Sequence, residues 1–127
     1  MTSQRQHLPV LTVSAKLHNG VAVIRVAGEL DLTTAPALRR RLRAAALPPA
    51  PPVLIVDVRE ISFCDSVGMS ELVLALHRSQ IDGQRLILSG LHGSLERLLY
   101  RTGLRNVFER HASCDAALRQ VGAETDQ

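Results

Sequence analysis

Apolar residues along the chain fall into two kinds of segment, short β-branched runs and longer stretches with helical spacing. The first two runs are separated by Asn19-Gly20, and this dipeptide predicts a tight hairpin because both residues tolerate positive φ angles. The run at 53–58 is almost unbroken, which is typical of a central parallel strand covered on both faces. We therefore predict five strands, at residues 10–17, 21–28, 53–58, 85–90 and 106–109.

Helical spacing appears between these runs. In the first helical stretch Leu38 and Leu42 share one face, and Thr33 or Thr34 stands in the N-cap position. The proline-rich segment 48–52 ends this helix, since proline cannot continue it. We predict four helices, at residues 31–47, 66–79, 93–104 and 113–121.

The predicted elements follow the order strand, strand, helix and then three strand–helix pairs. This order predicts an α/β fold in which an antiparallel hairpin is followed by right-handed crossovers into a mostly parallel, mixed sheet. Ser94 is expected to cap the third helix. We expect one ordered domain at residues 9–121, with flexible segments at 1–8 and 122–127.

Composition and charge fit a one-domain globular protein of 127 residues, with 46% hydrophobic and 21% charged residues. The formal net charge of +3 is too small to indicate nucleic-acid binding on its own. Two cysteines give no disulfide framework, and the first residues lack the apolar core of a signal peptide. No window approaches the roughly 18 apolar residues of a membrane span. We therefore expect a cytoplasmic protein that does not enter the membrane.

A serine occupies the loop after the predicted central strand, in the segment SFCDSVGMSEL at 62–72. Loops at the carboxyl ends of parallel strands are where α/β proteins usually place their sites. Ser66 fits a helix cap beside Asp65, a nucleophile, or a hydroxyl that a kinase modifies. A nucleophile elbow requires Gly-x-Ser-x-Gly, but Cys64 stands two residues before Ser66 and no local pattern marks a histidine base. The cap and the surface hydroxyl remain open, and neither excludes the other.

Other kinds of site have less support from the residues. A phospho-aspartate receiver would use Asp57 as its acceptor, but it needs a lysine near the last parallel strand and the only lysine is Lys16. No Gly-rich phosphate loop or metal-ligand spacing occurs, so we expect no cofactor and no metal. Cys64 is predicted to be a buried core thiol, and Glu29 and Asp31 are interpreted as loop acids or caps.

Two short blocks of the sequence are informative through the identity of their residues, and not only through the spacing of those residues. One is GELD at 28–31, and the other is the strand containing Asp57 followed by FCDSVG at 63–68. Both resemble the STAS domain of bacterial anti-sigma factor antagonists. The segment 91–109 is also similar to the third helix and fifth strand of that family. The resemblance covers nearly the whole chain and implies a single STAS domain at 9–121.

This resemblance implies a binding module that serves as a phosphorylation switch. In the family, the unphosphorylated protein binds an anti-sigma factor that is also a serine kinase with a histidine-kinase-like ATPase fold, and so frees the sigma factor. The kinase phosphorylates the serine after the motif aspartate, here Ser66, and a PP2C-type phosphatase reverses the reaction. The resemblance implies no enzymatic activity, no direct contact with nucleic acid and no membrane contact.

The family's partner-binding residues carry over to the positions that match its motifs. This sequence has Val67 where the family often has a second small hydroxyl residue, and Ser70 where glycine is frequent. The same domain also occurs in anion transporters and stress-signalling scaffolds, so an interaction subunit without a phosphorylation cycle is the alternative. The implied partner-binding residues are Glu29, Asp31, Asp65, Ser66, Val67, Gly68 and Met69.

Overall fold

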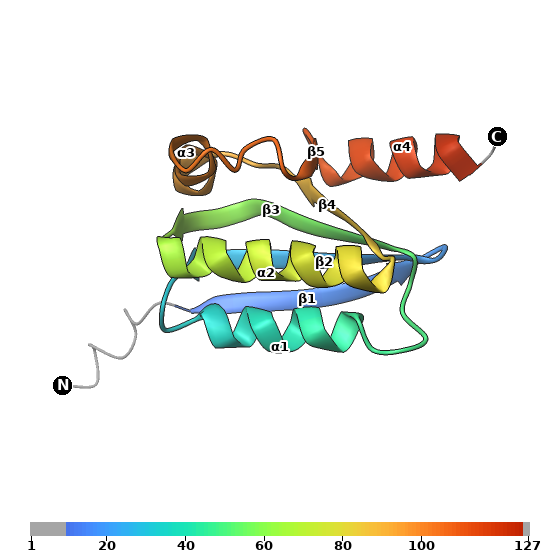
Figure 1. Ribbon diagram of the computed structural model, residues 1–127, viewed down its shortest axis with the longest axis horizontal. Coiled ribbons are helices and arrows are strands. Elements are labelled where there is room, and N and C mark those ends of the chain that lie inside the picture. Colours follow the sequence, from blue (N-terminus) through green and yellow to red (C-terminus); the bar gives the residue numbers. More distant parts are fainter. Residues whose placement is uncertain (1–9, 126–127) are drawn as a thin grey trace.

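Five strands form one sheet with helices on both of its faces (Figure 1). The computed structural model describes residues 10–125. In spatial and in sequence order the strands are β1 (Leu11–His18), β2 (Val21–Leu30), β3 (Val53–Cys64), β4 (Arg85–Ser89) and β5 (Glu109–His111). The helices are α1 (Ala35–Ala45), α2 (Ser66–Asp82), α3 (Gly93–Arg101) and α4 (Cys114–Thr125).

The strand pairing confirms the predicted α/β fold. β1 and β2 are antiparallel, and every later pair in the sheet is parallel. The hairpin turns at Asn19 and Gly20, whose φ angles are 50° and 78°, as the Asn-Gly signal predicts. The order of elements is also the predicted one.

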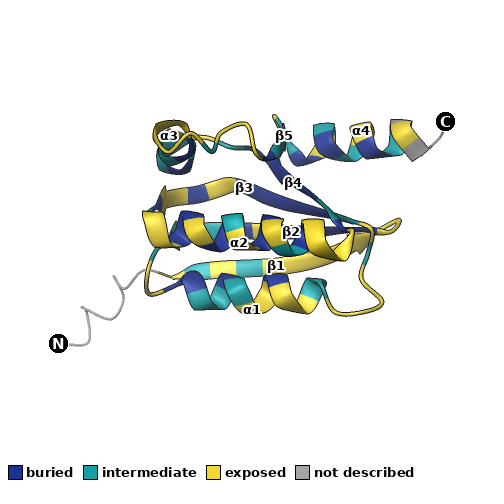
Figure 2. Cartoon of the chain, in the orientation of Figure 1, coloured by how far each residue is buried: buried dark blue, intermediate teal, exposed yellow. Residues whose placement is uncertain are grey.

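The sheet separates two apolar cores. The larger core joins one face of the sheet to α1, α2 and α3, with Leu38, Leu72 and Leu99 all fully buried. The smaller core joins the other face to α4, through contacts that include Ile55 and Ala117. Figure 2 shows the resulting pattern, in which the middle strands are largely buried and exposed residues lie on the outer elements. In the first half of β3, residues 54–56 are therefore apolar on both faces of the strand, which explains the unbroken run there.

One ion pair fixes α1 against α2. The guanidinium of Arg39 donates from Nε to both carboxylate oxygens of Glu71, at 3.2 and 3.1 Å. Glu71 is only 4% exposed, so this arginine neutralises a carboxylate that is largely removed from water. The pair sets the start of α2 beside α1, and with it the loop that carries the candidate serine.

Several element boundaries differ from the predicted ones. β3 continues to Cys64 instead of ending at residue 58. Its last part pairs only with β2 and has exposed polar positions, so it lacks the apolar run on which the prediction rested. β5 begins only at Glu109, since residues 105–107 form a turn and Phe108 after it is buried in the core. α2 and α4 extend to Asp82 and Thr125, beyond their predicted ends.

One predicted helix cap is wrong, and another is confirmed only in its position. α3 begins after His92, and Ser94 instead accepts a hydrogen bond on Oγ from the backbone N–H of Cys64 at 2.8 Å. Thr34 is the N-cap residue of α1 but its side chain makes no capping bond. α1 is also shorter than predicted, with a bend at Asp31 and a turn at residues 32–34 ahead of it.

The sheet has two different edges. β1 is the long edge strand, and its Val13 carbonyl accepts a hydrogen bond from Nη2 of Arg41 at 3.0 Å. β5 is the short edge strand, with three residues. Of the segments predicted to be flexible, 1–8 and 126–127 lie outside the described residues, whereas residues 122–125 belong to α4. Between residues 10 and 125, no helix combines the length and the apolar character that crossing a membrane requires.

Candidate functional site

Asp65 organises the loop between β3 and α2. It is the N-cap residue of α2, and its Oδ1 accepts the backbone N–H of Gly68 at 2.8 Å. Its Oδ2 accepts the N–H of Leu32, which lies 33 residues earlier in the chain, at 3.2 Å. Its own N–H donates to the carbonyl of Leu30 at 3.1 Å. One aspartate therefore fixes both the first turn of α2 and the loop between β2 and α1.

Gly68 is required by the close approach of α2 to the end of β2. A Cβ atom at this position would lie 2.6 Å from both the carbonyl oxygen and the Cγ atom of Leu30. Both distances are shorter than any van der Waals contact. The Asp65-Ser66-x-Gly68 motif thus has a structural basis, in which the aspartate caps the helix and the glycine lets the helix approach the strand.

Ser66 is the first residue of α2 and is exposed. The prediction that Ser66 caps α2 is wrong, because Asp65 takes that position. No hydrogen bond engages the Ser66 hydroxyl among residues 10–125, whereas the Ser66 carbonyl accepts from Oγ of Ser70 at 2.8 Å. The second interpretation, a hydroxyl available at the surface, therefore fits the geometry.

Asp31 lies in the loop that Asp65 holds. Its Oδ1 accepts from the Thr33 hydroxyl at 2.7 Å, from the Thr33 N–H at 3.0 Å and from the Thr34 N–H at 3.2 Å. These bonds, the Thr33 hydroxyl first, hold the pKa of Asp31 below its ordinary value. The hydroxyl of Thr34 in turn donates to the carbonyl of Glu29 at 2.7 Å. Asp31 therefore lies in a hydrogen-bonded turn after β2, and the Leu32–Asp65 bond holds this turn against the loop that carries Ser66. Glu29 lies within β2, so it is not the loop acid or cap that the sequence predicted.

Exposed apolar side chains accompany the serine. Leu32 is 67% exposed, Phe63 44% and Val67 37%. Leu32 is tied to Asp65 by the backbone bond described above, and Phe63 and Val67 are close to Ser66 in sequence. The yellow start of α2 in Figure 2 marks this exposed region. We name the surface formed by Leu32, Phe63, Ser66 and Val67 the serine surface.

The structure brings the predicted site residues together, but these residues differ in how far they are exposed. Ser66 and Val67 are exposed, while Gly68 and Met69 are buried beneath them. Sequence reasoning did not identify Leu32 or Phe63 as site residues. Phe63 could have been identified because it lies within the motif itself. Leu32 could have been identified because it is an apolar residue between polar ones in a loop.

Asp57 lies on a different part of the sheet from the serine. Its carboxylate is buried, accepts the Arg59 N–H at 3.2 Å and lies 3.5 Å from Nε of Arg25. This aspartate has an arginine partner and not the lysine that a receiver site needs. Over the described part of the chain, no cluster of His, Cys, Asp and Glu has the arrangement of a metal site.

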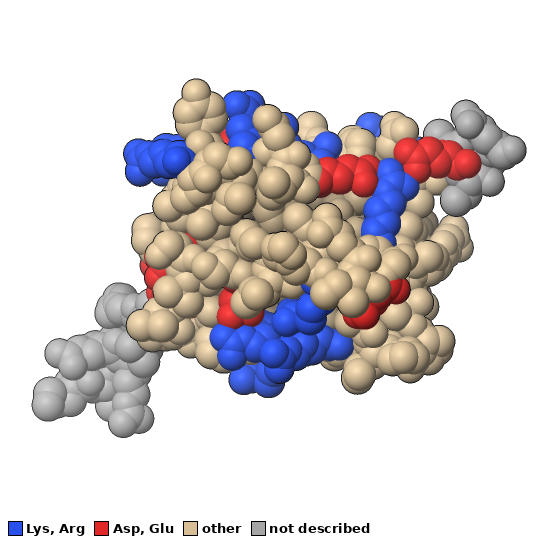
Figure 3. Space-filling model, in the orientation of Figure 1, with Lys and Arg blue, Asp and Glu red and all other residues tan. Residues whose placement is uncertain are grey.

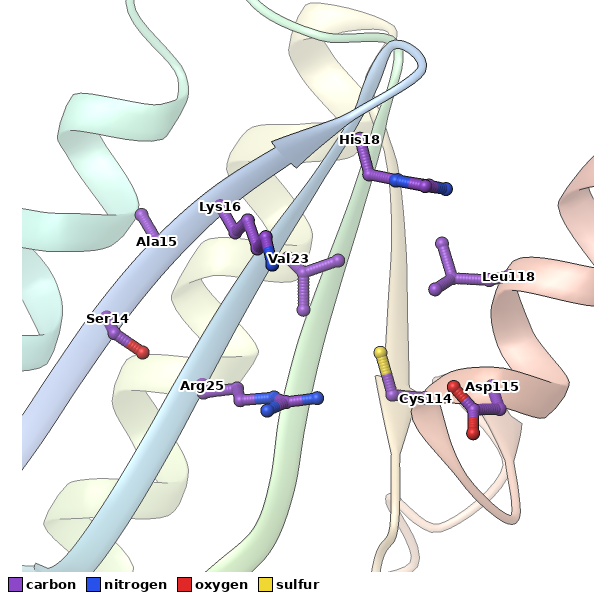
Figure 4. Close-up of a pocket in the computed structure, with 9 residues that line it drawn as sticks. All are labelled: Ser14, Ala15, Lys16, His18, Val23, Arg25, Cys114, Asp115 and Leu118. Atoms are coloured by element: carbon purple, nitrogen blue, oxygen red, sulfur yellow. The ribbon is translucent and has the colours of Figure 1, made fainter.

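A cavity of about 340 Å³ lies between the β1–β2 hairpin and the start of α4 (Figure 4). Lys16, His18 and Arg25 extend from the two strands toward Cys114 and Leu118 on the helix. Charged, polar and apolar groups mix along its walls, and Asp65 and Ser66 are not among them. This cavity is therefore separate from the candidate serine, which lies on an exposed surface.

Cys64, the last residue of β3, is buried directly below the serine surface, as predicted. Burial, followed by the charge of Asp65, raises the pKa of its thiol to about 12. The thiol donates to the carbonyl of Asp65 at 3.3 Å. Cys64 is thus a protonated core residue that supports the loop and is not a nucleophile at neutral pH.

Comparison with known proteins agrees with this geometry. The family model for the STAS domain matches residues 12–117. The anti-sigma-F factor antagonist RsfB of Mycobacterium tuberculosis is 39% identical over 113 residues, which cover 87% of this chain and 89% of that protein. The anti-sigma-B factor antagonist of Listeria monocytogenes is 36% identical over 86 residues, which cover 68% of this chain and 75% of that protein. A crystal structure of an anti-sigma factor antagonist from Mycobacterium paratuberculosis has a TM-score of 0.75 at 30% identity, covering 88% of this chain and 94% of that one.

Proposed function

The chain belongs to the STAS domain family, and on this premise we propose that it is an anti-sigma factor antagonist switched by phosphorylation of Ser66. In the unphosphorylated form it binds an anti-sigma factor, which is also a serine kinase, and so releases the sigma factor. A PP2C-type phosphatase restores the active form. The protein acts by binding and not by catalysis.

One observation carries this proposal: the exposed Ser66 hydroxyl is unbonded within residues 10–125 and stands on a rigid support. A kinase must reach the hydroxyl from solvent, and a hydroxyl without an internal partner loses no hydrogen bond when it is modified. The apolar residues Leu32, Phe63 and Val67 give a partner surface to bury. The acids Asp31 and Asp65 stay in place through the backbone bonds that they accept.

A phosphate on Ser66 changes the surface more than the fold. It adds about −1.5 to −2 charges at neutral pH, at the start of a helix whose dipole and free N–H groups favour an anion. Next to Asp65 and Asp31, the same charge opposes burial under a partner. A hundredfold loss of affinity corresponds to about 2.7 kcal/mol, a magnitude within the reach of one desolvated charge at an interface.

Phosphorylation is tested by incubating the protein with purified candidate anti-sigma kinases and ATP, followed by intact and peptide mass spectrometry. We expect one phosphate on the wild type and on Ser70→Ala, and none on Ser66→Ala. Ser70 is the matched control because it is an exposed serine one turn further along the same helix. Labelling of Ser66→Ala at the wild-type level would exclude Ser66 as the acceptor.

Partner binding is tested by calorimetry with the same kinases in ADP. The unphosphorylated protein is expected to bind, and the protein phosphorylated at Ser66 to bind about 100-fold more weakly, with both forms unfolding at the same urea concentration. If the chain binds only a transporter or a scaffold protein, and no ATPase-domain kinase, the proposed function is wrong and the alternative of an interaction subunit replaces it.

A further inference from the structure

α3 presents an outer face made largely of arginine. Arg97, Tyr100 and Arg101 are exposed on the helix, and Arg105 follows just after it. Together these four residues, which we name the basic α3 face, border a shallow hollow of about 360 Å³ with Glu96 on its rim. Figure 3 shows Lys and Arg side chains over this part of the molecule, at the upper left.

The arginines of this face have no ion-pair partner within the described residues. Arg97 and Arg101 are one helical turn apart, a spacing at which like charges repel. Arg105 lies over the Tyr100 ring, with its guanidinium carbon 5.5 Å from the ring centroid. In contrast, Arg39 and Arg85 each bind a glutamate elsewhere in the fold. The arginines of the basic α3 face therefore keep their hydrogen-bond donors available to a group outside the chain.

α3 also lies against the helix that carries the candidate serine. At the start of α3, Ser94 accepts the N–H of Cys64 at 2.8 Å, next to the β3–α2 loop. After its last turn, the hydroxyl of Thr102 lies 3.8 Å from Sδ of Met69, three residues from Ser66. A partner that docks at Ser66 is therefore within reach of the basic α3 face.

We infer that the basic α3 face binds an acidic segment of the same partner that docks at Ser66, an inference that rests on the proposed function. Guanidinium groups bind carboxylates through paired N–H donors, and the exposed Tyr100 ring adds a flat surface to cover. On one side of Ser66 the surface carries the acidic turn with Asp31, and on the other it carries the arginines of α3. This asymmetry permits one orientation of the partner and disfavours the reverse one.

The test uses two double variants with the same change in charge. Arg97→Glu with Arg101→Glu reverses the basic α3 face, and Arg40→Glu with Arg43→Glu reverses two exposed arginines of α1. Both are measured by calorimetry against the anti-sigma kinase that binds the wild type, at 50 and 500 mM salt. We expect at least a tenfold loss of affinity for the α3 variant at low salt, a smaller difference at high salt, and less than a threefold loss for the α1 variant. Equal losses, or no loss, would overturn the inference while leaving the proposed function intact.

A second arm is independent of the kinase. A ten-residue polyglutamate peptide is titrated into the full-length wild type and both variants, and amide shifts are followed by NMR. We expect shifts at residues 96–105 in the wild type and the α1 variant, and none there in the α3 variant. Absence of shifts at residues 96–105 in the wild type, or equal shifts over α1, would contradict the inference. If no kinase binds the wild type, the proposed function fails and this arm alone decides whether the face recognises acidic segments.

Discussion

The two bonds of the Asp65 side chain can be separated by two substitutions at one position. Asp65→Ala removes both the N-cap bond to Gly68 and the bond to Leu32. Asp65→Asn keeps one carbonyl oxygen, which suffices for the cap, but places an NH₂ group against the N–H of Leu32. The alanine variant therefore tests both bonds, and the asparagine variant tests the loop bond.

The expected magnitudes follow from the geometry. Loss of a side-chain N-cap costs about 1 kcal/mol. The bond to the exposed Leu32 N–H contributes about 0.5–1 kcal/mol, at the lower end for hydrogen bonds. We therefore expect the free energy of unfolding to fall by about 1.5–2 kcal/mol in Asp65→Ala and by about 0.5–1 kcal/mol in Asp65→Asn.

Urea denaturation followed by circular dichroism measures these free energies, with Asp115→Ala as the control. Asp115 is an exposed aspartate in the first turn of α4 whose carboxylate makes no hydrogen bond within residues 10–125, so its loss removes only the interaction with the helix dipole, about 0.5 kcal/mol. Equal losses in the asparagine and alanine variants would show that the retained oxygen does not cap the helix. A loss in Asp65→Ala no larger than in Asp115→Ala would refute the whole argument for a double anchor.

Three further outcomes follow from the structure. Gly68→Ala should lower the free energy of unfolding in urea by about 1–3 kcal/mol through its clash with β2, whereas Gly122→Ala, whose Cβ meets open space, should raise it by up to about 1 kcal/mol. Hydrogen bonds from Arg85 hold the pKa values of Glu109 and Glu124 below their ordinary range, so the stability lost in Arg85→Ala should be largest near neutral pH and shrink as the two glutamates are protonated at acidic pH. Urea midpoints across pH measure this change. Iodoacetamide at pH 8 should label Cys64 only after unfolding, and rapid labelling of the folded protein would contradict its burial and its raised pKa.

The sequence predicts the fold because its signals are local. The Asn-Gly turn, the unbroken run at 53–58 and the apolar faces of the helices each depend on neighbouring residues, and together they define the order of elements. The second half of β3 lacked such a signal. Beyond Asp57 the strand has no β4 neighbour, and three of its exposed positions there carry the polar residues Arg59, Glu60 and Ser62, which resemble a loop.

The candidate site is only partly predictable for a related reason. The position of Ser66 after the central strand follows from the topology. The topology does not show that Asp65, and not Ser66, is the N-cap residue of α2. The carboxylate of Asp65 also binds Leu32, and that bond joins residues that only the packing of β2 beside β3 brings together. The ion pair between Arg39 and Glu71 could not be predicted for the same reason, because the two residues lie 32 positions apart on different helices.

The β1 edge of the sheet bears on how the protein behaves at high concentration. An uncovered edge strand offers its backbone to the strands of other molecules, and this is a common route to aggregation. Here Arg41 already occupies the Val13 carbonyl, and the chain's only lysine, Lys16, lies in the same strand with an exposed side chain. An incoming strand must displace the Arg41 guanidinium and place its own residues beside the charged Lys16 side chain. The edge is thus less open to pairing with a second molecule than a bare edge strand of the same length, and this should favour solubility at high concentration.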